Sequence, residues 1–222
     1  MTTSVAETHL AAAPKILILG ATGPTGRHIV GQAVSRGYDV TVLVRSPEKA
    51  TDLKGAKLVI GDARDEKALR QAIKGRDAVI SALGTPASPF REVTLLSTAA
   101  RALLKAMKAE QVLRLIAITV IGAGDSAGHG GFLFDNVIFP LILRNVYADK
   151  NRQEAIIKGS DVDWTIVRPS ILNNKPGGNT IRALTDLRNF HGGSISRADV
   201  ATFILDHVNS DAWLRKLPLI TW

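Results

Sequence analysis

Three glycines spaced three residues apart follow directly on a short apolar run in the segment ILILGATGPTGRHIV, residues 16–30. The apolar run predicts a buried strand, and the residues after the glycines predict the start of a helix. A turn with so little side chain lets the backbone approach a ligand, and the helix N-terminus offers unpaired N–H groups to phosphate. We therefore predict a pyrophosphate site in this turn, formed by Gly20, Thr22, Gly23, Pro24, Thr25 and Gly26.

Apolar runs of strand length alternate with longer segments of helical periodicity along the rest of the chain. Strands are expected at residues 15–20, 39–45, 57–62, 78–83, 114–120 and 163–169, with a weaker one at 217–221. Most of these runs are continuously apolar, which is typical of parallel strands covered on both faces. The pattern predicts a single doubly wound Rossmann domain with helices on both faces of a mainly parallel sheet. We expect about seven strands in the order 3-2-1-4-5-6, with the seventh at the edge.

Length and composition exclude several classes of protein. The 222 residues are enough for one large domain, and we expect a flexible tail at 1–13 and the nucleotide-binding domain at 14–222. The absence of cysteine excludes disulfides and thiolate catalysis, and it fits a cytoplasmic protein. The apolar stretch 131–147 contains charged residues and a proline, so membrane insertion is not expected. No zinc or helix-turn-helix motif indicates nucleic acid, and His129 has too few neighbouring ligands for a metal site.

The end of the second predicted strand bears on the choice of cofactor. An acid at this place would bind a free ribose 2′-hydroxyl, whereas an arginine suits a 2′-phosphate. The sequence here is TVLVRSPEKA, with Arg45 followed by Ser46 and no acid at the strand end. The formal net charge of +8 also favours an anionic ligand. We therefore predict NADP rather than NAD; a surface arginine that begins a turn is the alternative.

Six motifs in order carry a resemblance to a known family. The chain between about Lys15 and Ile204 resembles the atypical short-chain dehydrogenase/reductases with an NAD(P)H-binding domain. The motifs that carry the resemblance are, in order, GATGPTGRHIV, VTVLVRSPEK, GDARD, ALGTP, DWTIVRPSIL and ISRADVATFIL. Within that group the chain looks most like the flavin reductase/biliverdin-IXβ reductase branch and its NmrA-like neighbours. The resemblance implies an NADPH-dependent oxidoreductase, monomeric or homodimeric, that transfers hydride to a small planar conjugated acceptor such as a flavin, quinone or bilin. The alternative is a non-catalytic NmrA-like sensor of NADP(H).

The resemblance also implies cofactor contacts outside the glycine turn. Beside the adenine it places Asp62 and Ala63, and along the cofactor Ala82, Leu83 and Gly84. At the nicotinamide end it places Thr119, Lys150, Pro169, Ser170 and Ile171.

The candidate catalytic residues are Thr119, Tyr147 and Lys150. Ordinary short-chain dehydrogenases carry a tyrosine and a lysine four residues apart on one helical face, whereas Tyr147 and Lys150 are three apart. A tyrosine at the end of an apolar stretch is also typical of packing, so both interpretations stay open. The segment 122–147 is a candidate lid, pocket wall or dimer surface.

Overall fold

The computed structural model describes residues 13–126, 143–188, 190 and 192–222. Almost all of the predicted tail 1–13, together with His129 and most of the segment 122–147, lies outside the described residues. The predictions made for them therefore stay predictions.

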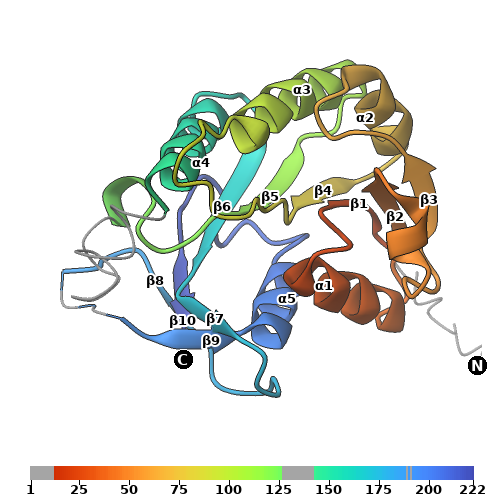
Figure 1. Ribbon diagram of the computed structural model, residues 1–222. Helices are drawn as coiled ribbons and strands as arrows, with labels where there is room; N and C mark the ends of the chain where they lie inside the picture. Colours follow the sequence, from red (N-terminus) through yellow and green to blue (C-terminus); the bar gives the residue numbers. More distant parts are fainter. Residues whose placement is uncertain (1–12, 127–142, 189, 191) are drawn as a thin grey trace, which may run out of the picture.

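Eight strands form one sheet in the order β3-β2-β1-β4-β5-β6-β10-β8 (Figure 1). The first six are Lys15–Leu19 (β1), Asp39–Val44 (β2), Lys57–Ile60 (β3), Ala78–Ser81 (β4), Arg114–Ile118 (β5) and Asp163–Pro169 (β6). They pair in parallel, so the predicted order 3-2-1-4-5-6 is confirmed. The doubly wound α/β fold is confirmed with it.

The far edge of the sheet differs from the prediction. The expected seventh strand is Leu219–Thr221 (β10), which pairs in parallel with β6, but Arg182–Leu184 (β8) covers it as an antiparallel edge strand. Two more short strands, Ile171–Asn173 (β7) and Ser194–Ser196 (β9), form a separate ladder. Each of β7, β8 and β9 has three residues, too few to give a hydrophobic period in the sequence.

Helices cover both faces of the sheet. Pro24–Ser35 (α1) and Arg197–Asp206 (α5) lie on one face, and Glu66–Ile73 (α2), Leu95–Ala109 (α3) and Arg144–Lys158 (α4) lie on the other (Figure 1). Two short 3-10 helices, Pro47–Ala50 (η1) and Gly124–Ser126 (η2), lie in connections. Strand β1 divides the two cores: Ile16 and Ile18 pack with α1 and α5, whereas Leu17 and Leu19 pack with α2 and α3. Each such buried side chain contributes about 1.5–3 kcal/mol to folding.

Helix starts follow the polar residues that the sequence offers. Asp65 accepts a hydrogen bond from the Lys67 N–H at the start of α2, and Ser196 accepts one from the Asp199 N–H at the start of α5. α1 and α5 run side by side in the same direction, since Gln32 bonds the Ala198 carbonyl and Arg36 pairs with Asp206 further along. The first turn of α5 therefore lies beside the C-terminal half of α1.

The described residues contain neither a membrane-spanning helix nor a cluster of metal ligands. None of the helices is long and apolar enough to cross a membrane. Within the same part of the chain, no three His, Cys, Asp or Glu side chains are grouped as metal ligands.

Candidate functional site

The glycine turn between β1 and α1 is tightly packed against the next strand. Gly20 has a φ of +77°, which side chains other than glycine disfavour, and a Cβ there would lie 2.4 Å from the Ala82 carbonyl oxygen. Gly26 is buried beneath the turn, where a Cβ would lie 2.2 Å from the Gly20 carbonyl oxygen. Gly23 caps α1 without any side-chain hydrogen bond, so the first N–H groups of the helix remain open to an anion.

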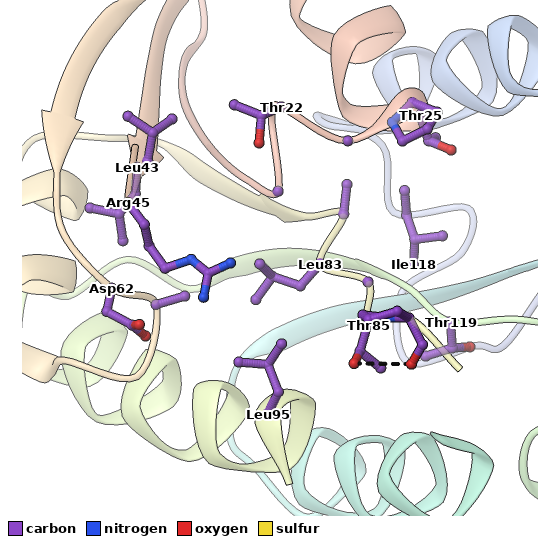
Figure 2. A pocket seen from close by; sticks show the side chains of 18 of the residues that line it. Thr22, Thr25, Leu43, Arg45, Asp62, Leu83, Thr85, Leu95, Ile118 and Thr119 are labelled. Atoms are coloured by element: carbon purple, nitrogen blue, oxygen red, sulfur yellow. Dashed lines mark hydrogen bonds between the residues drawn. The ribbon is translucent and has the colours of Figure 1, made fainter. Parts of the chain in front are cut away.

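A cavity of about 570 Å³ extends from this turn across the carboxyl ends of the strands (Figure 2). It brings most of the predicted site residues together: Gly20, Thr22, Gly23, Pro24, Thr25, Arg45, Asp62, Ala63, Ala82, Leu83, Gly84, Thr119 and Lys150. Residues that the sequence analysis did not assign also line it, namely Leu43, Val44, Gly61, Thr85, Pro86, Leu95, Ile118, Leu172 and Arg197. Four of these residues lie within the motifs ALGTP, DWTIVRPSIL and ISRADVATFIL, namely Thr85, Pro86, Leu172 and Arg197. Their place in these motifs was the sequence signal that could have identified them.

One end of the cavity lies beside β2 and β3. Arg45 follows β2, and its guanidinium extends toward Leu83 and the interior of the cavity (Figure 2). It is exposed and forms no hydrogen bond or ion pair with the residues that the structure describes. Ser46, its neighbour, does not line the cavity and is the N-cap residue of the 3-10 helix η1.

The acid at this end is neutralised by its own neighbour. Asp62 accepts hydrogen bonds from the Arg64 guanidinium at 2.8 and 2.9 Å and from the Arg64 N–H at 2.8 Å. These bonds from Arg64 lower the pKa of Asp62 to about 2. At this end of the cavity, Arg45 is therefore the cation that has no carboxylate partner among the described residues.

The other end of the cavity is built on a buried polar cluster. Thr119 follows β5, and its hydroxyl donates to Glu154 Oε1 at 2.7 Å. Arg168 on β6 donates to both oxygens of the same carboxylate, at 3.1 Å to Oε1 and 2.5 Å to Oε2. All three side chains are at least 95% buried. Glu154 and Arg168 were not predicted from the sequence, because nothing local links a helix interior to the end of the next strand.

Lys150 lies one turn before Glu154 on α4, lines the cavity and is half-buried. Burial lowers the pKa of Lys150 to about 8, and the nearby charges of Glu154 and Asp149 partly oppose that shift. Its ammonium group thus stays charged at neutral pH but loses its proton within the range of ordinary assays.

Tyr147 is not brought into the cavity. Its side chain is 3% exposed, and its hydroxyl donates to the Ile121 carbonyl at 3.0 Å. Of the two residues of the predicted acid–base pair, only Lys150 therefore reaches the site. The tyrosine hydroxyl faces the loop after β5 instead.

The end of β6 and the two residues after it also lie differently from the prediction. Pro169 and Ser170 are buried, and the Ser170 hydroxyl bonds Thr221 at 3.1 Å. Ile171 is 52% exposed, begins β7, which pairs with β9, and does not line the cavity. Leu172 is the residue of this segment that lines the cavity.

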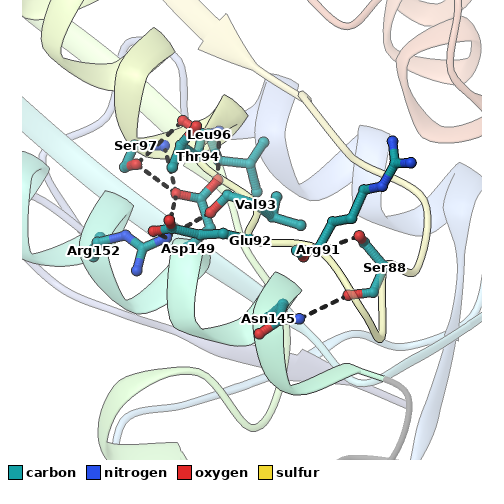
Figure 3. A network of polar contacts seen from close by, with 10 residues as sticks. All are labelled: Ser88, Arg91, Glu92, Val93, Thr94, Leu96, Ser97, Asn145, Asp149 and Arg152. Carbon is teal, nitrogen blue, oxygen red and sulfur yellow. Dashed lines mark hydrogen bonds and ion pairs between the residues drawn. The ribbon is translucent and has the colours of Figure 1, made fainter.

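Helix α4 also fixes the loop between β4 and α3 (Figure 3). Asp149 is fully buried and accepts hydrogen bonds from the N–H groups of Leu96 and Ser97, so it caps α3 from a neighbouring helix. Asn145 donates to the Ser88 carbonyl at 3.0 Å, and Arg152 donates to the Val93 carbonyl. The helix that carries Lys150 therefore also holds the loop that contributes Gly84 to Pro86 to the cavity.

Comparison with known proteins gives relatives of several kinds. The chain is 30% identical over 207 residues to the Bacillus subtilis protein named uncharacterized sugar epimerase YhfK, across 89% of this chain and 90% of that one. It is 30% identical over 155 residues to the (4-alkanoyl-5-oxo-2,5-dihydrofuran-3-yl)methyl phosphate reductase of Streptomyces griseus, across 69% of this chain and 46% of that one.

Among solved structures, the anaerobilin reductase ChuY of Escherichia coli O157:H7 superposes with a TM-score of 0.79 at 22% identity. The superposition covers 93% of this chain and 96% of ChuY, and at this identity it shows a shared fold. The family model described as NAD(P)H-binding matches residues 20–211, which include the glycine turn, Arg45, Thr119 and Lys150. The chain belongs to this NAD(P)H-binding family.

Proposed function

We propose that this protein is an NADPH-dependent oxidoreductase that transfers hydride to a planar conjugated acceptor of the flavin, quinone or bilin type. The observation that carries the proposal is the single cavity that joins the glycine turn and Arg45 at one end to Thr119 and Lys150 at the other. ChuY, a bilin reductase by name, has the same fold, and the Streptomyces griseus relative is a reductase by name.

In this proposal the chain binds the cofactor mainly by its phosphates. The open N–H groups at the start of α1 hold the pyrophosphate, with Thr22 and Thr25 as further donors. The Arg45 guanidinium pairs with the ribose 2′-phosphate, which explains a preference for NADP over NAD. Asp62, the acid at this end, is already paired with Arg64 through both carboxylate oxygens.

The reaction needs a hydride and a proton, and the two come from different sources. The bound nicotinamide supplies the hydride. Lys150 is charged at neutral pH and lies at the Thr119 end of the cavity, where it stabilises negative charge on the reduced acceptor and donates the proton. Solvent then returns a proton to Lys150. Tyr147 has no part in this scheme because its hydroxyl bonds a backbone carbonyl outside the cavity.

The charges of the cavity favour an acceptor that carries an acidic group. Arg197, at the start of α5, lines the wall next to Leu172. Among the described residues its guanidinium bonds an uncharged group, the Asn174 amide oxygen, at 2.7 Å. Asp62 is the one acid among the described residues that line the cavity, and Arg64 neutralises it. A flavin mononucleotide or a bilin, each with acidic groups, therefore fits this wall better than a neutral quinone.

The second candidate is a non-catalytic sensor of NADP(H). The position of Tyr147 favours it, because the tyrosine acid of ordinary short-chain dehydrogenases is missing from the cavity. The same observation argues against an epimerase activity of the kind that the name of YhfK indicates, because epimerisation also needs an acid–base pair at the substrate.

NADPH oxidation at 340 nm tests the proposal, with flavin mononucleotide, a small quinone and biliverdin offered in turn and NADH as the control cofactor. Saturable turnover that prefers NADPH supports the reductase. Tight NADPH binding without oxidation by any of the three acceptors would favour the sensor.

A further inference from the structure

The polar cluster around Thr119 fixes the direction in which the Thr119 hydroxyl donates its proton. Glu154 Oε1 accepts from Thr119 and from Arg168 Nε, while Oε2 accepts from Arg168 Nη2. A carboxylate offers only acceptors, and an arginine offers only donors. The Thr119 hydroxyl must therefore donate to Glu154, and it has no proton left for any other partner.

This arrangement is rigid because it is buried. Glu154 is 3% exposed and Arg168 is 2% exposed, so water does not compete for the carboxylate. Rotating the Thr119 hydroxyl away would leave a buried carboxylate with one hydrogen bond fewer, and such a loss is costly. Thr119 also sits between two strands, where its N–H donates to the Val167 carbonyl at 2.9 Å.

The Thr119 hydroxyl can consequently only accept a hydrogen bond from a ligand in the cavity. A nicotinamide carboxamide has both a carbonyl oxygen and an amino group, and a hydroxyl that only accepts bonds the amino group alone. The Thr119 hydroxyl thus favours one of the two orientations of the carboxamide.

We propose that Glu154, held by Arg168, is a positioning residue that turns the Thr119 hydroxyl into a hydrogen-bond acceptor for the amino group of the nicotinamide carboxamide. This inference rests on the proposed placement of the nicotinamide at the Thr119 end of the cavity. It does not require that the protein reduces any acceptor.

Calorimetric titration with two oxidised cofactors tests the inference without turnover. The probes are NADP and its 3-acetylpyridine analogue, in which a methyl group replaces the amino group. We expect the wild-type protein to bind NADP about tenfold more tightly than the analogue, since one hydrogen bond is lost. Thr119→Val removes the hydroxyl and leaves the ion pair, and it should bring this ratio close to one.

The link to Glu154 is tested by substitutions that leave Thr119 in place. Glu154→Leu combined with Arg168→Met replaces the ion pair with apolar side chains of similar volume, which buried sites often accept. The Thr119 hydroxyl can then rotate, and the ratio should fall as in Thr119→Val. Adding Thr119→Val to this double variant should change the ratio no further, because both act through the same hydrogen bond.

Thr165→Val is the matched control, since Thr165 is a buried threonine on β6 whose hydroxyl bonds the Trp213 carbonyl away from the cavity. It should keep the wild-type ratio. A folded Glu154→Leu/Arg168→Met protein with an unchanged ratio would overturn the role of Glu154. Should that variant fail to fold, an unchanged ratio in Thr119→Val alone would overturn the proposal, and a lowered ratio there would support it. If the protein binds NADP more tightly than the analogue but reduces no acceptor, the proposed reductase activity is refuted and this inference stands.

Discussion

The two ends of the cavity hold their charges in opposite ways. At the β2 end, Arg45 is exposed and has no ion-pair partner among the described residues, so its charge is available to a ligand. At the β5 end, Glu154 and Arg168 are buried and satisfy each other, so their charges act on neighbouring groups rather than on a ligand directly. In the roles proposed above, the first end contributes cofactor affinity and the second contributes orientation. Substitutions at the two ends should therefore change different measured properties of the protein.

The largest expected effect is on stability at the buried end. Glu154→Ala leaves the Arg168 guanidinium buried without its carboxylate, and breaking such a pair costs about 3–5 kcal/mol. Urea unfolding should show this loss, whereas Arg45→Ala should lie within about 0.5 kcal/mol of the wild type. Equal stability of the two variants would remove the contrast between the ends.

The second effect is on cofactor affinity at the exposed end. Arg45→Ala should weaken NADP binding about 30- to 100-fold, because a charge-assisted bond to the 2′-phosphate is lost, and it should leave NAD binding nearly unchanged. Calorimetry with both cofactors measures this. Arg36→Ala is the matched control, since Arg36 pairs with Asp206 at the far end of α1. A parallel loss of NAD affinity in Arg45→Ala would mean that Arg45 does not recognise the 2′-phosphate.

The third effect is on the pH dependence of the reaction. The pKa of Lys150 is lowered to about 8, so the group is protonated below that pH and loses its charge as the pH rises through it. NADPH oxidation should therefore decline above about pH 8. Lys150→Met should reduce kcat about tenfold and abolish this decline, because solvent must then supply the proton.

Lys158→Met, on the exposed last turn of the same helix, is the control and should keep the wild-type profile. A decline near pH 8 that persists in Lys150→Met would assign the titration to another group.

The sequence predicted the exposed end better than the buried end, for a physical reason. The glycine turn, the strand order and Arg45 are local patterns, and parallel strands bring such strand-end residues to one edge without further information. The Thr119–Glu154 bond joins residues 35 apart in the chain, and it depends on which face of α4 meets β5. Tyr147 shows the same limit, since its spacing from Lys150 allowed a shared face but did not say where the hydroxyl would bond.

The smallest expected effect is on the binding of the acceptor, and it concerns a second arginine of the cavity. Arg197 resembles Arg45 in lining the cavity with no carboxylate partner among the described residues, yet it bonds the Asn174 amide and is partly buried. Its contribution to an acidic acceptor should therefore be modest. Arg197→Ala should raise KM for flavin mononucleotide or biliverdin about threefold and leave KM for a neutral quinone unchanged.

Arg182→Ala, which alters an exposed arginine on β8 outside the cavity, is the control for net charge. The outcome also decides which ligand Arg197 faces, because Arg197 lines the same cavity as the glycine turn. If Arg197→Ala weakened NADP binding and left every acceptor KM unchanged, Arg197 would belong with Arg45 among the cofactor residues. The acidic-acceptor preference would then have no support from this wall, and the acceptor would have to be identified from the buried end alone.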